Sequence, residues 1–263
     1  MAGTRDERPI RRGTAGLLLW LAALPPAATA QGWGGAIGYG TDNVYRGVSL
    51  SSGRPAWLAD LHYGFGTEWT AGIGASQERP PFQSDGAQFT LYLDRRWQID
   101  EDWSAKLGVV HYESPWNVWR DELNYNELTA AVGWHGRWRL SLALSPDTPG
   151  VFTRNGADTD FAAAAELSYH QPLHGRLAAD FGAGYARIRN AIEFDYRPAD
   201  PRGGEARRMR SDLSYGYGSA GLSYGIGDVY IYSSLLWASP GAVQYNTGSK
   251  SRTRWVTTLV WSF

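Results

Sequence analysis

Apolar and polar residues alternate one by one along most of the chain, in short segments separated by glycine, proline and other turn-forming residues. An extended strand sends successive side chains to opposite faces, so each segment predicts a β-strand with one apolar face and one polar face. In the last segment, over 254–263, Leu259, Trp261 and Phe263 share one face and Thr258 lies on the other. The pattern favours an all-β fold.

About twelve segments alternate in this way, and their connections are tight and long in turn. We expect strands over 33–45, 56–66, 69–77, 88–98, 103–112, 125–135, 138–144, 160–170, 176–187, 212–225, 229–238 and 254–263. Bacterial membrane barrels have even strand numbers, short turns at one end and long loops at the other, whereas a soluble β-sandwich does not separate its loops so regularly. The chain therefore predicts a transmembrane antiparallel up-and-down β-barrel of about 12 strands over 31–263, with both termini on the periplasmic side.

Two positions depart from the alternation. Within the expected strand over 212–225 the phase changes near Gly218, which indicates a β-bulge, because one extra residue moves every later side chain to the other face. Arg95 lies in the lipid-facing phase of its strand, close to a tight turn. There its long side chain would reach the lipid headgroups.

Aromatic residues gather at both ends of the expected apolar faces, with leucine, alanine, isoleucine and valine between them. Those beside the tight turns are Phe65, Trp69, Trp97, Trp103, Trp134, Trp138, Tyr169, Tyr224 and Trp261. Those beside the long loops are Trp57, Phe89, Tyr185, Trp237 and Trp255. Amphipathic rings prefer headgroup depth, so we expect the tryptophans among them to mark two membrane interfaces, with outer-membrane lipids around the barrel.

The composition excludes several other classes of protein. After the N-terminus no apolar run approaches the roughly 20 residues that a membrane helix needs, which excludes a helical membrane protein. The 13 Trp, 15 Tyr and 32 Gly suit strands and turns, and the net charge of −1 gives no reason to expect a nucleic-acid partner. Cysteine is absent, so disulfides and cysteine metal sites are excluded, and we expect no metal and no cofactor.

The first thirty residues predict a cleavable signal peptide over 1–30. Arg11 and Arg12 form a basic flank, 17–24 is a short apolar core, and 28–30 reads Ala-Thr-Ala, a small-residue cleavage site. A membrane anchor helix is the alternative, but the apolar core is too short for one. Export together with strands predicts a bacterial outer-membrane location.

Charged and polar residues occupy the phase that faces the barrel interior. The expected lumen residues are Asp42, Arg46, Asp60, His62, Lys106, Glu127, Arg139, Glu166 and Asp180. They could line a channel and tune its selectivity, or form ion pairs that stiffen the wall. Because 33–45 and 56–66 would pair as a hairpin, we expect Arg46 to contact Asp42 and Asp60 near the extracellular mouth.

Two other classes of function compete with a channel. A membrane-embedded lipid hydrolase needs a nucleophile, a base and an orienting group within hydrogen-bond reach. His111 lies in the outward phase near the extracellular end of its strand, but no serine stands out in the right phase on the neighbouring strands. We therefore expect no enzymatic activity. The third class is a structural or adhesive barrel whose loops bind partners.

One segment resembles a known family. Tyr45-Arg46-Gly47-Val48-Ser49, followed by Pro55-Ala56, is similar to the opening of the TorF family of porins. The specific similarity covers about residues 36–75. The resemblance implies an outer-membrane barrel that allows passive diffusion of small hydrophilic solutes.

The chain ends in Phe263 after a run of alternating apolar residues. This ending resembles the signal that the outer-membrane insertion machinery reads. The resemblance implies that barrel-assembly machinery is a partner during biogenesis.

Overall fold

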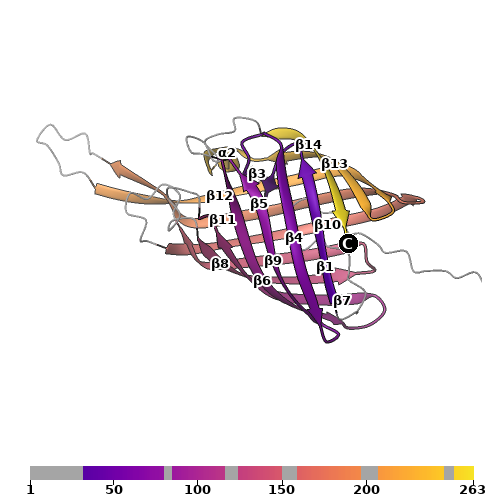
Figure 1. The fold of residues 1–263 in the computed structure, drawn as a ribbon. Helices are drawn as coiled ribbons and strands as arrows, with labels where there is room; N and C mark the ends of the chain where they lie inside the picture. The colour runs from indigo at the N-terminus through magenta and orange to yellow at the C-terminus, as the bar shows by residue number, and fades with distance from the viewer. Residues whose placement is uncertain (1–31, 80–84, 116–123, 150–158, 197–206, 246–251) are drawn as a thin grey trace, which may run out of the picture.

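The structure is a computed structural model, and it describes residues 32–79, 85–115, 124–149, 159–196, 207–245 and 252–263. The expected signal peptide over 1–30 lies outside these residues. The described chain forms a closed antiparallel barrel of twelve strands, which confirms the predicted fold class (Figure 1). The strands are β1 (Gly32–Gly40), β4 (Ala56–Phe65), β5 (Trp69–Glu78), β6 (Gly86–Gln98), β7 (Trp103–Glu113), β8 (Tyr125–Trp134), β9 (Trp138–Pro149), β10 (Thr159–His174), β11 (Leu177–Tyr196), β12 (Arg207–Ile226), β13 (Val229–Ala238) and β14 (Thr253–Ser262).

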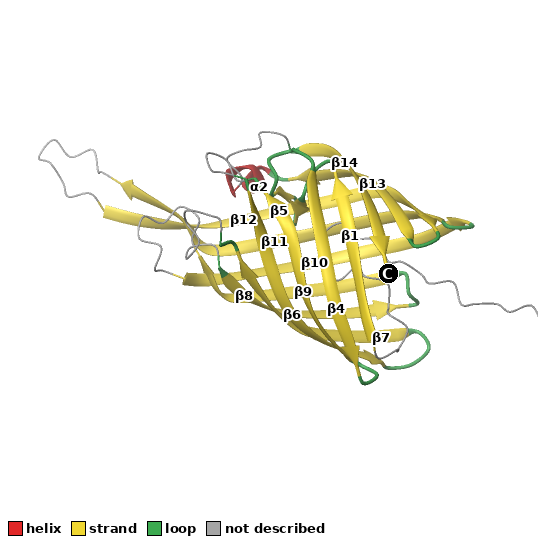
Figure 2. Cartoon of the chain, in the orientation of Figure 1, coloured by secondary structure: helices red, strands yellow, loops and turns green. Residues whose placement is uncertain are grey.

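Each strand pairs with the strands before and after it in the sheet order, so the barrel is up-and-down. Tight turns join the strands at one end, and several of them carry a glycine with positive φ, including Gly66 at 63° and Gly227 at 60°. The strand ends that are separated by more residues in the chain lie at the opposite end of the barrel (Figure 2). The predicted alternation of tight and long connections is thus confirmed.

The last strand closes the barrel against the first. β1 and β14 pair antiparallel, and the N–H of Gly35 donates to the carbonyl of Phe263 at 3.0 Å while the N–H of Phe263 donates to the carbonyl of Gly35 at 3.0 Å. The Phe263 ring lies 5.1 Å from the ring of Trp261. The start of β1 and the end of β14 therefore lie together at the tight-turn end.

The outer surface is apolar over most of its area. Large hydrophobic side chains remain exposed there, such as Ile73 at 56%, Leu91 at 60% and Trp255 at 63%. All nine tryptophans expected at the membrane interfaces lie in the outward phase of their strands. Arg95 also lies outside, where its guanidinium pairs with Glu68 at 2.8 Å and lies over the ring of Trp97. Its charge is therefore neutralised beside a tight turn.

The bulge expected near Gly218 is wrong. β12 pairs without interruption there, since Gly218 faces Ala183 on β11 and Trp237 on β13. The phase appears to change in the sequence because Tyr215 and Tyr217 are apolar residues that point into the lumen near the long-loop end. The register shift between these strands lies elsewhere, between Ile188 and Ile192 of β11.

The first strand is shorter than expected. β1 ends at Gly40, and the chain then turns inward instead of continuing to residue 45. Two short strands, β2 (Val44–Tyr45) and β3 (Val48–Ser49), pair as a small separate sheet. One short helix, α2 (Pro240–Tyr245), follows β13. Among the described residues, no helix has the length and apolar character to cross a membrane.

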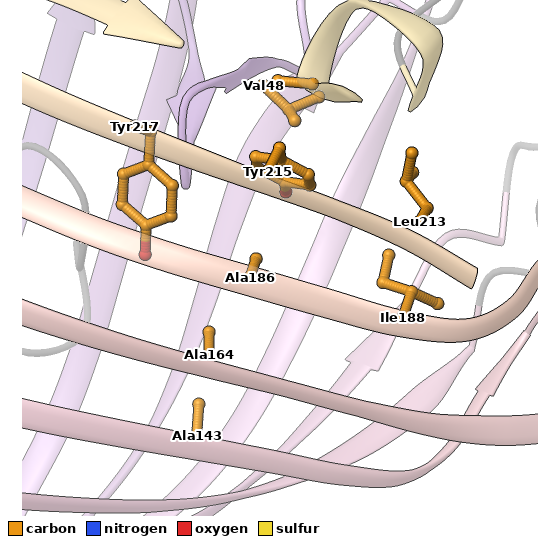
Figure 3. Close-up of a cluster of buried hydrophobic side chains, with 9 residues drawn as sticks. Val48, Ala143, Ala164, Ala186, Ile188, Leu213, Tyr215 and Tyr217 are labelled. Atoms are coloured by element: carbon orange, nitrogen blue, oxygen red, sulfur yellow. The ribbon is translucent and has the colours of Figure 1, made fainter. Parts of the chain in front are cut away.

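An apolar cluster packs the segment that contains β2 and β3 against the inner wall of the barrel. The cluster joins Val48 of β3 to small residues of the barrel and to α2, and comprises Val48, Ala143, Ala164, Ala186, Ile188, Leu213, Tyr215, Tyr217 and Ala242 (Figure 3). Ala143, Ala164 and Ala186 are direct cross-strand partners on β9, β10 and β11. Because alanine side chains are short, this part of the wall leaves space for the segment to pack inside the lumen.

Candidate functional site

The segment over 41–53, called the lumenal hairpin below, turns back on itself at Arg46 and Gly47. Both residues have positive φ, 48° and 77°, as a two-residue type I′ turn requires. A side chain at Gly47 would also collide with the wall, because an added Cβ would lie 2.7 Å from Cβ of Tyr217. The Arg-Gly pair that carries the family resemblance therefore forms the tip of the hairpin.

Asp42 fastens the base of the hairpin. Its carboxylate accepts hydrogen bonds from the hydroxyls of Ser49 and Ser51, at 2.6 and 2.7 Å. Arg254 of β14 donates to the other oxygen at 2.6 Å. Asp42 is only 7% exposed, so these three donors satisfy a buried charge. These hydrogen bonds thus tie the hairpin to itself and to the last strand.

Arg46 spans the lumen from the hairpin tip to β8. Its guanidinium donates two hydrogen bonds to Glu127, at 2.7 and 2.9 Å, which is the paired geometry of a strong ion pair. Glu127 is 2% exposed, and it also accepts from the hydroxyls of Tyr45 and Ser145 at 3.3 and 3.4 Å. Tyr45 and Arg46 together lock the tip against the opposite wall.

The contact expected between Arg46 and the two aspartates is wrong. Arg46 binds Glu127, and Asp42 binds Arg254. Asp60 accepts from Nδ1 of His62 at 2.7 Å and from the hydroxyl of Tyr92 at 2.8 Å. The prediction failed because it placed Arg46 on a strand beside Asp60, whereas the chain leaves the wall after Gly40.

The structure places all nine predicted lumen residues on the inner side of the barrel. Beyond those already described, Lys106 pairs with Asp94 at 2.5 Å, and Asp180 pairs with His170 at 2.6 Å. Nε of Arg139 donates to Ser141 at 3.3 Å. Glu166 accepts from the Tyr217 hydroxyl at 3.4 Å. Their part in conduction stays a prediction.

Several inward charged residues escaped the prediction. Asp94, Arg96, His170 and Arg254 all occupy the inward phase of their strands. Asp94 and Arg96 could have been predicted from the alternation within β6, because Leu91 and Leu93 show which positions of this strand point outward. The partner of Arg254 carries no such signal, because Asp42 lies 212 residues away in the chain.

A cavity that is open to solvent lies between the hairpin tip and the wall of β6–β10. Its charged lining residues are Arg46, Lys106, Arg139, Asp94, Glu127 and Glu166, and its tyrosines are Tyr92, Tyr112 and Tyr217. The charged lining residues are thus equal numbers of cations and carboxylates, and alanine and leucine side chains such as Ala143 and Leu142 line the cavity beside them. Within the described ranges, no group of three or more histidine, aspartate or glutamate side chains could hold a metal ion.

His111 forms a short polar relay on the outer surface. Its Nδ1 lies 3.0 Å from the amide oxygen of Asn126, and Asn126 donates to Asp147 at 2.6 Å. On its other side along the sheet His111 faces Leu91. Neither of its two cross-strand neighbours, Leu91 and Asn126, carries a hydroxyl group.

The comparisons with known proteins concern the fold. No protein-family model matches the chain, and no curated protein matches its sequence, so the resemblance to the TorF family is not confirmed. A chain solved in work on the in-meso crystallization of membrane proteins is 8% identical over 88% of this chain and 83% of that chain, with a TM-score of 0.51. That likeness shows a shared fold.

Two channel-like or outer-membrane structures are more distant. The CymD monoaromatic hydrocarbon channel is 10% identical over 96% of this chain and 93% of its own, with a TM-score of 0.45. The outer membrane protein Omp33 of Acinetobacter baumannii is 7% identical over 90% of this chain and 99% of its own, with a TM-score of 0.42.

Proposed function

We propose that the chain is an outer-membrane channel for passive diffusion of small hydrophilic solutes, with the lumenal hairpin as its constriction. The observation that carries the proposal is the contrast between the two faces of one wall. The outer face exposes large apolar side chains, and the inner face carries charged and hydroxyl side chains around an open cavity. A wall with this polarity suits lipid outside and water inside.

The outer surface supports a membrane location independently of any relative. In a soluble protein, exposed apolar side chains of this number would form a patch far larger than the few hundred Å² that monomers normally expose. Bacterial barrels with even strand numbers and short turns at one end belong to the outer membrane. The TorF resemblance, carried by Arg46 and Gly47, supports a porin within that class.

The hairpin supports a narrow passage. It enters the lumen from the end opposite to the tight turns and is held at its base by Asp42 and at its tip by Arg46. A twelve-stranded barrel is wider than an eight-stranded one, whose interior side chains fill it. The lumenal hairpin therefore narrows the lumen of a barrel that would otherwise leave more open space.

Purified protein in planar lipid bilayers should show discrete conductance steps, and vesicles containing it should swell in small sugars faster than in larger oligosaccharides. A matched control is Arg95→Gln, which changes an outer-surface residue and should leave the conductance as it is, provided that the barrel still folds. If a folded, inserted barrel shows neither conductance nor swelling, the channel proposal is wrong.

Deleting Phe263, or replacing it with aspartate, should prevent assembly and leave the chain in the periplasm. Deletion removes both backbone hydrogen bonds to Gly35, and aspartate places a charge beside Trp261 at the apolar rim. Cell fractionation and the heat-modifiable band of a folded barrel are the measurements. Phe263→Tyr keeps the aromatic ring and is the control. A folded aspartate variant in outer-membrane fractions would contradict this expectation.

A further inference from the structure

Three cations face the lumen on one side of the barrel, over the four successive strands β6 to β9. They are Arg96 of β6, Lys106 of β7 and Arg139 of β9, called the basic cluster below. Arg96 and Lys106 are direct cross-strand partners. Arg139 faces Gly133 of β8, which in turn faces Ser104, two residues before Lys106. The three side chains thus share one patch of the inner wall, within Coulombic range of each other.

This arrangement is unfavourable for the wall itself. Like charges placed directly opposite on one face of a sheet destabilise the pairing, with Cβ atoms only about 5 Å apart. Lys106 is balanced by Asp94 at 2.5 Å. Arg96 has no ion-pair partner among the residues that the structure describes, and it is exposed to the lumen. An ion-pair role in stiffening the wall therefore does not account for Arg96.

The surroundings favour an anion that reaches several cations together. Lys106 and Arg139 line the cavity below the hairpin, so a solute in that cavity meets them. Two carboxylates flank the cluster: Asp94 binds Lys106, and Glu166 accepts from Tyr217. Three cations against two carboxylates leave the patch with a net positive charge, so its attraction for an anion grows with the charge of that anion.

We propose that the basic cluster is a binding site for small multivalent oxyanions of the phosphate class on their way through the lumen. The proposal rests on the channel function above and names a solute class for it. Guanidinium groups such as those of Arg96 and Arg139 suit the oxygens of such an anion, and Lys106 adds a point charge.

The test is current block by inorganic phosphate in single-channel recordings at fixed KCl concentration. The wild-type current should fall with added phosphate and saturate. Arg96→Gln should raise the half-blocking concentration about tenfold, because one charge-assisted contact is lost. Its melting temperature should be equal or higher, because the substitution removes the repulsion with Lys106. Lys106→Gln is a poorer test, since it leaves Asp94 unpaired in the wall.

Arg95→Gln is the matched control. It removes the same charge one residue earlier, on the outer surface beside Glu68, and should leave the phosphate block unchanged. If both variants weaken the block equally, the effect is one of total charge and the site is wrong. If the Arg96→Gln variant folds and phosphate blocks its current as in the wild type, the proposed site is also wrong.

Equilibrium dialysis of phosphate against the detergent-solubilised barrel separates this proposal from the channel function. Binding that weakens in Arg96→Gln but not in Arg95→Gln supports the site even if no conductance is found. Conductance without phosphate block or binding overturns the site and leaves the channel intact.

Discussion

Replacing Arg46 with alanine is expected to free the lumenal hairpin, raise the single-channel conductance and shift ion selectivity towards cations. The side chains of Arg46 and Glu127 are only 13% and 1% exposed, so the substitution leaves a carboxylate buried without its counter-ion. Breaking a buried pair in this way costs about 3–5 kcal/mol. The remaining negative charge in the lumen then attracts cations. Single-channel recordings, reversal potentials in a salt gradient and thermal melting measure these effects.

Two controls separate the ion pair from a general loss of charge. The double variant Arg46→Ala/Glu127→Ala removes the stranded carboxylate, so it should recover much of the lost stability while the conductance stays high. Arg54→Ala breaks an exposed pair with Asp85, whose side chains are 51% and 48% exposed, and should change little. An unchanged conductance in a folded Arg46→Ala barrel would show that the hairpin does not limit the passage.

Replacing Gly47 with alanine should displace the hairpin tip and raise conductance without altering any charge. At φ 77° an alanine is strained by about 1–3 kcal/mol. Its Cβ would also lie 2.7 Å from Cβ of Tyr217 and 3.2 Å from Cβ of Ala238, neither of which is the end of a flexible side chain. The tip must therefore move away from β12 and β13. Conductance and protease sensitivity of the hairpin are the measurements.

Gly53→Ala is the matched control for this substitution. Gly53 also has a positive φ, 71°, but no atom lies within 4 Å of an added Cβ. It shares the backbone strain of Gly47→Ala and lacks the collision. If both variants raise conductance equally, the effect comes from backbone strain and the packing of the tip on Tyr217 does not position the hairpin.

The sequence predicts the barrel because its strands are two-faced. Apolar side chains recur at every second residue because one face of each strand meets lipid and the other faces the polar interior. The twelve strands and the outward tryptophans can therefore be predicted from this local alternation. The alternation misleads where the lumen is apolar. Tyr215 and Tyr217 pack inside against Val48, and the sequence alone does not distinguish this interior cluster from a lipid-facing strand.

The alternation of polar and apolar residues does not predict the contacts of the lumenal hairpin. Arg46 and Glu127 are 81 residues apart, and their pairing depends on where the chain bends after Gly40. Residues 41–45 can continue the alternation of polar and apolar residues of the first strand, so this alternation does not reveal the bend. The Arg-Gly pair does carry a signal, because Gly47 allows the turn, but a turn does not indicate which wall it faces.

The closure between β1 and β14 has a consequence for folding order. Every other ladder of the barrel joins two strands with no other barrel strand between them in the chain, so each can form by a short loop closure. The seam between β1 and β14 instead brings together residues such as Thr41 and Thr257, which are 216 positions apart in the chain. Five residue pairs face each other across this seam, whereas nine do so between β1 and β4. The entropic cost of loop closure grows with length, so this seam is expected to form last. Until this seam forms, the sheet is open and has two unpaired edges, which makes the interval before closure the stage most exposed to aggregation.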